Sequence, residues 1–160
     1  MKMKFLFCSL PLITSACGSI DLTRDVYVEP EFMAYVEDFQ MQTGLTNIIP
    51  ISFKKIEEEY IIALCYNYNN TSKNYIEIDR DEFNQLNDAE KQETIYHELG
   101  HCLLNRAHDE TILKSTTYGI KTSIPKTIMY PYVFGSKYLQ YKQYYVNELV
   151  DETTSLFSFL

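Results

Sequence analysis

Glycine and proline are scarce in this chain, whose 160 residues include only five of each. So low a content excludes a collagen-like chain, and the 46% hydrophobic and 22% charged residues are typical of an ordered globular protein. The length is sufficient for one hydrophobic core but not for two full domains. We therefore expect a single globular domain.

Positive charge is also scarce, since 14 lysines and arginines stand against 22 acidic residues and give a net charge of -8. This balance disfavours binding to nucleic acid or to anionic lipid, and it favours neutral, cationic or metallic partners. Beyond the N-terminus, no stretch approaches the roughly 18 apolar residues that a membrane-spanning helix needs. We expect no nucleic-acid partner and no multi-pass membrane protein.

The N-terminus has the pattern of an export signal. Lys2 and Lys4 precede an apolar stretch, and the small residues Thr-Ser-Ala come directly before Cys17. This pattern resembles a bacterial lipoprotein signal, in which lipid is attached to the cysteine that becomes the first residue of the mature protein. An ordinary cleaved signal peptide is the alternative.

The lipoprotein resemblance implies a signal peptide at residues 1–16, a tether at residues 17–28 and a domain at residues 29–160. The protein would then be exported and held at the outer membrane or the periplasmic face of the cell envelope. Lipid on Cys17 would be its only membrane contact, and without that lipid the protein would be secreted.

Two of the four cysteines remain after Cys8 is assigned to the signal and Cys17 to the lipid. In an oxidising compartment, Cys65 and Cys102 suggest one disulfide. The alternative is two buried free cysteines that pack as small hydrophobic residues.

Two helices are predicted from apolar residues that recur at helical spacing. The first lies between Pro30, at its start, and Gly44, at its end. The second begins near Ala89, with Asn87 or Asp88 as its N-cap, and places one apolar stripe against a sheet.

Extended segments are predicted at residues 48–56, 60–68 and 75–79. Residues 107–126 are polar and are expected to be irregular, and a last helix is expected over residues 137–150, with Tyr144 facing water. These elements predict an α+β fold.

His97, Glu98 and His101 form the pattern H-E-x-x-H. On a helix, residues four apart lie on one side, so both imidazoles can bind one metal ion while Glu98, which does not bind it, can take a proton from water. The third and last histidine of the chain, His108, lies just beyond the predicted helix, where a turn could bring it back. A solvated helix surface is the alternative.

The run HELGHCLLNRAHD resembles the metzincin clan of zinc metalloproteases, whose motif is H-E-x-x-H-x-x-G-x-x-H. The chain has one residue more between the second and third histidines, and Asn105 stands where a glycine would be expected. Asparagine is the next best residue for a left-handed turn. Downstream, a Met-Tyr-Pro sequence is most similar to the methionine turn of the matrixin branch, with Met129 as the apolar floor of the metal site.

The resemblance implies a minimal metzincin-like domain, in which a small twisted sheet packs on the N-terminal helix and the active-site helix, with a further helix at the C-terminus. It implies Zn²⁺ held by His97, His101 and His108, with Glu98 as the general base of a metalloendopeptidase. The expected partner is a peptide or protein substrate, laid along an antiparallel edge strand at residues 75–79. We expect a monomer.

Several alternatives remain open at this point. Asp109 could replace His108 as the third ligand, or could orient an imidazole. In another group of zinc proteases the third ligand would be a downstream acid, here Glu148 or Asp151. A zinc-stabilised envelope lipoprotein without catalysis, and a structural protein without metal, are the remaining alternatives.

Overall fold

The computed structural model describes residues 26–68, 73–117 and 120–151. The predicted signal peptide, the candidate lipidation site Cys17 and most of the predicted tether lie outside the described residues. Among the helices of the described part, none has both the length and the apolar character needed to cross a membrane.

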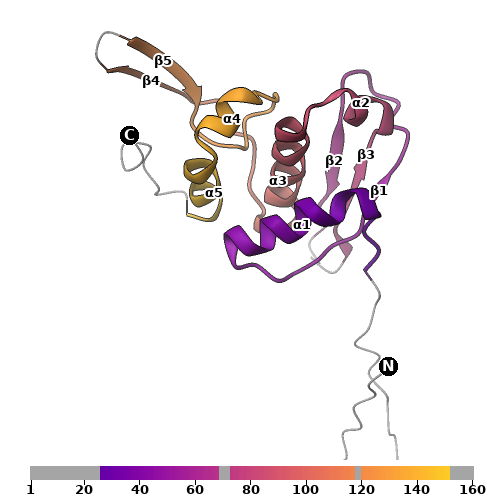
Figure 1. The fold of residues 1–160 in the computed structure, drawn as a ribbon. Helices are drawn as coiled ribbons and strands as arrows, with labels where there is room; N and C mark the ends of the chain where they lie inside the picture. Colours follow the sequence, from indigo (N-terminus) through magenta and orange to yellow (C-terminus); the bar gives the residue numbers. More distant parts are fainter. Residues whose placement is uncertain (1–25, 69–72, 118–119, 152–160) are drawn as a thin grey trace, which may run out of the picture.

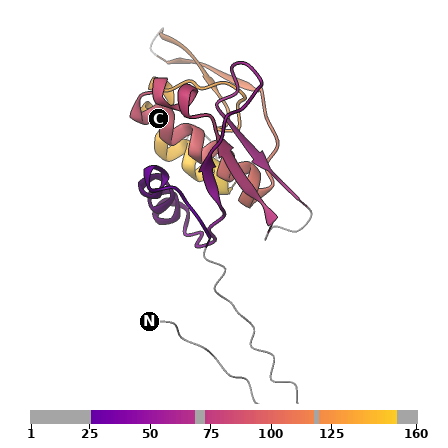
Figure 2. The same ribbon diagram turned by 90° about the vertical axis from the view of Figure 1, so that its right-hand side faces the viewer.

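The described residues form an α+β fold, as the sequence predicts. Figures 1 and 2 show a sheet with helices on one side and a separate hairpin that projects from the body of the molecule. In chain order the elements are α1 (Pro30–Thr43), β1 (Ile51–Phe53), β2 (Ala63–Tyr66), β3 (Tyr75–Ile78), α2 (Arg80–Gln85), α3 (Asp88–Leu104), β4 (Ile112–Thr117), β5 (Ile120–Pro125), α4 (Ser136–Gln140) and α5 (Lys142–Val150).

The main sheet has the strand order β1-β3-β2, with β1 parallel to β3 and β2 antiparallel to it. The prediction that residues 75–79 form the antiparallel edge strand is therefore wrong: β3 is central, and β2 is the antiparallel edge. In β3, Ile76 and Ile78 are fully buried, while Tyr75 and Glu77 are half-buried. This alternation indicates that helices cover one face of the strand, but it is the same for central and edge strands.

Helix α1 begins and ends where the sequence predicts. Pro30 occupies the first turn, where a backbone N–H would have no helical partner, and Gly44 ends the helix in the left-handed conformation with a φ of 74°. The ring of Phe39 meets that of Tyr96 on α3 edge-on, with 5.1 Å between the ring centroids. The buried side chains of α1 are Phe32, Val36 and Phe39.

Helix α3 is the central element, between the sheet and the C-terminal helices (Figure 1). Its N-cap is Asn87, whose side chain accepts hydrogen bonds from the N–H groups of Ala89 and Glu90. The Glu90 carboxylate accepts the N–H of Asn87 in return, which completes a capping box. The predicted apolar stripe is buried at Ile95, Leu99 and Cys102.

Asp38 joins three helices at the side of α3. Its carboxylate accepts hydrogen bonds from Gln92 at 2.6 Å and from the Tyr96 hydroxyl at 2.8 Å, both on α3. Lys142 of α5 donates to the same oxygen at 2.9 Å. Because Asp38 and Lys142 are 104 positions apart, local sequence patterns could not reveal this contact.

Two predictions for the C-terminal part are wrong. Residues 107–126 are not irregular throughout, because β4 and β5 pair as an antiparallel hairpin. The single helix expected over residues 137–150 is divided at Tyr141 into α4 and α5. Tyr144 is only 1% exposed and does not face water, because its hydroxyl finds a backbone acceptor inside the protein.

Cys65 and Cys102 are joined in a disulfide, with their Cα atoms 5.7 Å apart. The bond links edge strand β2 to α3, next to His101. It closes a loop between residues 37 positions apart, and such a cross-link stabilises a fold mainly by restricting the unfolded chain.

Replacement of both Cys65 and Cys102 by alanine should lower the free energy of unfolding by about 2–4 kcal/mol, because the unfolded chain regains the freedom of the open loop. Urea denaturation of both proteins, without metal, measures the difference. Wild type in a thiol reductant is the control and should approach the double variant. An unchanged urea midpoint in the double variant would contradict the prediction.

Candidate metal centre

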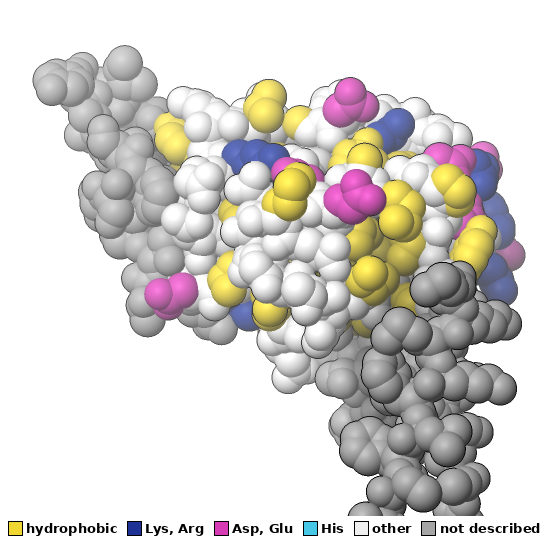
Figure 3. Space-filling model, turned by 60° about the horizontal axis from the view of Figure 1, so that its bottom comes forward, with side chains coloured by type: hydrophobic (Ala, Val, Ile, Leu, Met, Phe, Trp, Pro, Cys, Tyr) yellow, Lys and Arg dark blue, Asp and Glu magenta, His cyan; other side chains and the backbone are white. Residues whose placement is uncertain are grey.

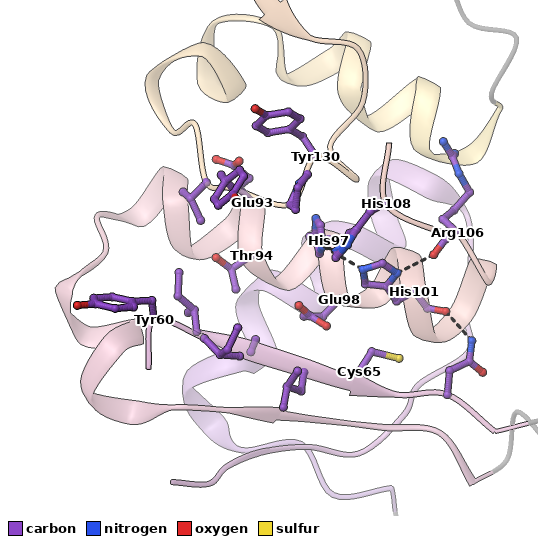
Figure 4. Close-up of a pocket in the computed structure, with 18 residues that line it drawn as sticks. Tyr60, Cys65, Glu93, Thr94, His97, Glu98, His101, Arg106, His108 and Tyr130 are labelled. Atoms are coloured by element: carbon purple, nitrogen blue, oxygen red, sulfur yellow. Dashed lines mark hydrogen bonds between the residues drawn. The ribbon is translucent and has the colours of Figure 1, made fainter. Parts of the chain in front are cut away.

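Three imidazoles converge at the C-terminal half of α3. His97 and His101 lie one turn apart on the helix, and the chain returns after the helix to place His108 beside them (Figure 4). The Nε2 atom of His97 is 3.0 Å from that of His101 and 3.1 Å from that of His108. The structure therefore brings together the three histidines that the sequence singles out.

Hydrogen bonds determine which nitrogens of two of these rings face one another. The Nδ1 atom of His97 lies 2.8 Å from the carbonyl oxygen of Ile128, and that of His101 lies 2.6 Å from the carbonyl oxygen of Arg106. A carbonyl oxygen can only accept, so each Nδ1 carries the hydrogen and donates it. In the neutral rings, the two Nε2 atoms then present lone pairs to each other.

Burial favours the neutral form of His97 and His101. The pKa of His97 is lowered to about 4, mainly by burial and also by the neighbouring His101 and His108, although the hydrogen bond to the Ile128 carbonyl opposes this shift. The pKa of His101 is also below its ordinary value, again mainly because of burial. Neutral imidazole is the form that binds a metal ion.

The donor set fits zinc. A Zn–N distance of about 2.0–2.1 Å separates the nitrogens of a tetrahedral site by roughly 3.3 Å. This is close to the 3.0 and 3.1 Å between the Nε2 atom of His97 and those of His101 and His108. All three Nε2-bearing rings offer a ligand atom within 4.8 Å of the others. Backbone carbonyls that accept from the opposite ring nitrogen are the usual second contact of a metal-binding histidine.

The segment that resembles a methionine turn lies directly against this helix. The Sδ atom of Met129 would be 2.5 Å from a Cβ atom added at Gly100, between the two helical histidines. The carbonyl of Ile128 accepts from His97, and the carbonyl of Met129 accepts from the N–H of Asp109 at 3.1 Å. The turn thus contacts the helix, one imidazole and the loop that carries the third histidine.

Two tyrosines of α5 form hydrogen bonds, inside the protein, with the backbone just before Met129. The hydroxyl of Tyr145 donates to the carbonyl of Pro125 at 2.9 Å, and the hydroxyl of Tyr144 donates to that of Lys126. The sequence alone predicts Tyr144 to face water, because its acceptor at Lys126 lies 18 positions away and no local pattern reveals it.

Glu98 lies in the same cavity as the histidines. It is 7% exposed, and burial raises the pKa of its carboxyl group to about 7, although a hydrogen bond from the backbone N–H of Cys65 partly opposes this. Figure 4 shows the carboxylate between the histidines and the strand that carries Cys65. A carboxylate so placed can exchange a proton near neutral pH.

The cavity has a volume of about 610 Å³ and is lined by two different walls. One wall is edge strand β2 and the segment before it, with Leu64 and Ile62, and the other is the segment that follows Met129, with Tyr130 and Val133. No histidine is visible among the coloured side chains of the face in Figure 3, whereas Figure 4 shows all three beside the cavity.

Glu93 anchors the second wall, a role that the sequence analysis missed. The carboxylate is 3% exposed and accepts hydrogen bonds from the N–H groups of Phe134 at 2.9 Å and Gly135 at 2.8 Å. Burial raises its pKa to about 7, although these two hydrogen bonds oppose the shift.

The acidic alternatives to His108 have other partners. Asp109 accepts from the N–H of Thr111 at 2.9 Å and pairs with Lys126 at 3.1 Å. The hypothesis that Asp109 orients an imidazole is wrong for His97 and His101, because the Nδ1 atoms of both rings bind backbone carbonyls. Glu148 is buried and pairs with Arg106 at 2.7 Å. His108 is the residue that lies with the other two imidazoles.

Comparison of the chain with protein-family models, with curated proteins and with solved structures finds no match.

Gly100→Ala should destabilise the protein, although alanine is normally about 1 kcal/mol better than glycine inside a helix. The new Cβ would lie 2.5 Å from Met129 Sδ and 3.0 Å from Leu149 Cδ1, in a fully buried site. Overpacking of this kind costs about 1–3 kcal/mol. Thermal unfolding of the metal-free protein measures the sign. A Gly100→Ala, Met129→Ala double variant is the control and should be less destabilised than the sum of the two single variants.

Glu93→Gln should change how stability depends on pH. The folded chain holds the Glu93 proton up to a pKa of about 7, whereas the unfolded chain releases it near 4.5. This contribution to stability is complete below pH 4.5 and is lost as the pH rises through 7. Urea denaturation of the metal-free protein should therefore show a steeper loss of stability from pH 5 to 7 in wild type than in Glu93→Gln. Parallel curves would contradict this assignment.

Proposed function

We propose that this protein is a zinc-dependent endopeptidase of metzincin type, with a matrixin-like methionine turn. The observation that carries the proposal is one cavity that contains three convergent imidazoles and a buried carboxyl group with a pKa of about 7. His97, His101 and His108 would hold the ion. The contact between Met129 and Gly100 supports the same assignment.

Zinc, when bound, would act as a Lewis acid towards the scissile carbonyl and would lower the pKa of a water. Glu98 can then act at both ends of the reaction: its carboxylate takes a proton from the attacking water and later donates it to the leaving amine. A nearby cation lowers the pKa of a carboxyl group, so metal binding would favour the charged form of Glu98 that accepts a proton.

Edge strand β2 supports an extended peptide as the substrate. In the described residues β2 pairs with β3 on one side only, and its other side faces the cavity. An unpaired strand edge can form backbone hydrogen bonds with a peptide of almost any sequence. We therefore assign peptide binding to β2 instead of residues 75–79. The proposed mode of binding, in which the peptide adds a strand to the sheet, is unchanged.

We also propose that the enzyme works outside the cytoplasm. The disulfide between Cys65 and Cys102 supports this location, because such bonds persist mainly in oxidising compartments. The lipoprotein-like signal ending before Cys17 is the second argument.

Glu98→Gln should retain zinc but lose peptide cleavage by about 10²–10⁴-fold, because the amide cannot accept the proton of the attacking water. The experiment measures zinc content and the cleavage of casein and of a fluorogenic peptide library by the chain from Gly18, with and without a chelator. The matched control is Glu37→Gln, at an exposed position on α1, which should leave both quantities unchanged.

Bound zinc without cleavage in wild type would favour the non-catalytic lipoprotein instead. Equal cleavage by wild type and Glu98→Gln would show that Glu98 is not the general base. Absence of bound zinc in wild type would overturn the proposal.

A further inference from the structure

The position of His108 depends on where and how α3 ends. The helix continues to Leu104, and Asn105 then turns the chain with a φ of 54° and a ψ of 32°. The N–H groups of both Asn105 and Arg106 donate to the carbonyl of Gly100. His108 follows this turn by three residues, so a small change in the turn would move its imidazole away from the other two.

The last carbonyls of a helix have no partner within the helix. Here the segment between β2 and β3 supplies two of them with side-chain donors. Asn67 Nδ2 donates to the carbonyl of His101 at 3.0 Å, and Asn74 Nδ2 donates to that of Cys102 at 2.7 Å. Neither contact is a feature of the H-E-x-x-H pattern, and each spans about thirty positions of the chain.

The two amides are linked to each other and to the turn. Asn74 also donates to Asn67 Oδ1 at 3.0 Å, and Asn67 also donates to the side-chain oxygen of Asn105 at 2.9 Å. The backbone N–H of Tyr68 donates to Asn74 Oδ1 at 2.8 Å and fixes this amide, which is 1% exposed. The contacts form one connected network from the sheet to the turn.

We propose that Asn67, Asn74 and Asn105 form a clamp that sets the turn after α3 and thereby positions His108 as the third zinc ligand. The network contacts the segment between His101 and His108. This segment is one residue longer than in the metzincin motif and has Asn105 in place of the expected glycine. In the clamp, Asn105 provides the left-handed conformation, and Asn67 binds both the last turn of the helix and the Asn105 side chain. The three asparagines are positioning residues, and the inference rests on the zinc site of the proposed function.

Asn67→Ala should weaken zinc binding by about 10–100-fold, as the loss of a contact to a ligand-bearing segment typically does. Competition with a chromogenic chelator measures the zinc affinity of the oxidised chain from Gly18. Asn84→Ala, at an exposed position on α2, is the matched control and should stay within twofold of wild type.

A double-variant comparison separates positioning of His108 from a general loss of structure. In a His108→Ala background, Asn67→Ala should lower zinc affinity by less than threefold, because the ligand through which it acts is absent. Co²⁺ absorption gives an independent readout: Asn67→Ala and His108→Ala should change the visible spectrum in the same direction. An equal loss of zinc affinity in both backgrounds would overturn the proposal.

Asn105 offers a second test, should Asn67→Ala not fold. Asn105→Ala should weaken zinc binding because alanine disfavours the left-handed turn, whereas Asn105→Gly should recover most of the affinity. Equal zinc affinity of Asn105→Ala and wild type would overturn the clamp. Unchanged zinc affinity in Asn67→Ala would overturn it as well and would leave the zinc peptidase standing, while absence of zinc binding in wild type would remove both.

Discussion

The convergence of three imidazoles is the constraint on which the rest of the site depends. The Nδ1 hydrogens of His97 and His101 are committed to backbone carbonyls, so their Nε2 atoms face each other without a hydrogen at 3.0 Å. Neighbouring lone pairs repel one another, so contacts from other segments must hold the two rings in this arrangement.

These contacts reach the site from three directions. The segment with Ile128 and Met129 provides the Ile128 carbonyl and the packing of Met129 on Gly100. Helix α5 holds that turn through Tyr145 and pairs Glu148 with Arg106, whose carbonyl accepts from His101. The sheet acts through the disulfide and the asparagine network. Each direction uses groups with defined hydrogen-bond or packing partners, so all three contribute to the placement of the imidazoles.

The parts of the site that the sequence predicts are those set by local geometry. The four-residue spacing of His97 and His101 follows from one helical turn, and the helix start follows from the capping signal at Asn87. The left-handed turn at Asn105 could also be expected from residue type alone. In each case, the physical cause lies within a few positions of the residue.

The rest depends on contacts between distant segments, which no periodicity reveals. Edge and central strands have the same alternation, so the sequence does not distinguish β3, which is central, from the edge strand that β2 forms. In the sequence, Glu93 has the pattern of an acidic residue on a helix surface. In the structure, the loop at Phe134, 41 positions later, covers it. In the sequence, Asn67 and Asn74 are ordinary loop residues. Only the fold shows that they contact the end of α3.

The short segment at residues 65–67 connects edge strand β2 to Glu98 and to the helix that carries His97 and His101. At Cys65, the disulfide holds α3 and the backbone N–H contacts Glu98, and two residues later Asn67 contacts the carbonyl of His101. Under the proposed function, a peptide paired with β2 would therefore lie in a fixed position relative to both the general base and the metal ligands. The opposite wall is connected to the same groups, because Glu93, which holds it, lies on α3 one turn before His97, and the Ile128 carbonyl just before that wall accepts from His97. Under the proposed function, the helix that carries the reacting groups would therefore hold both walls of the substrate cavity in place.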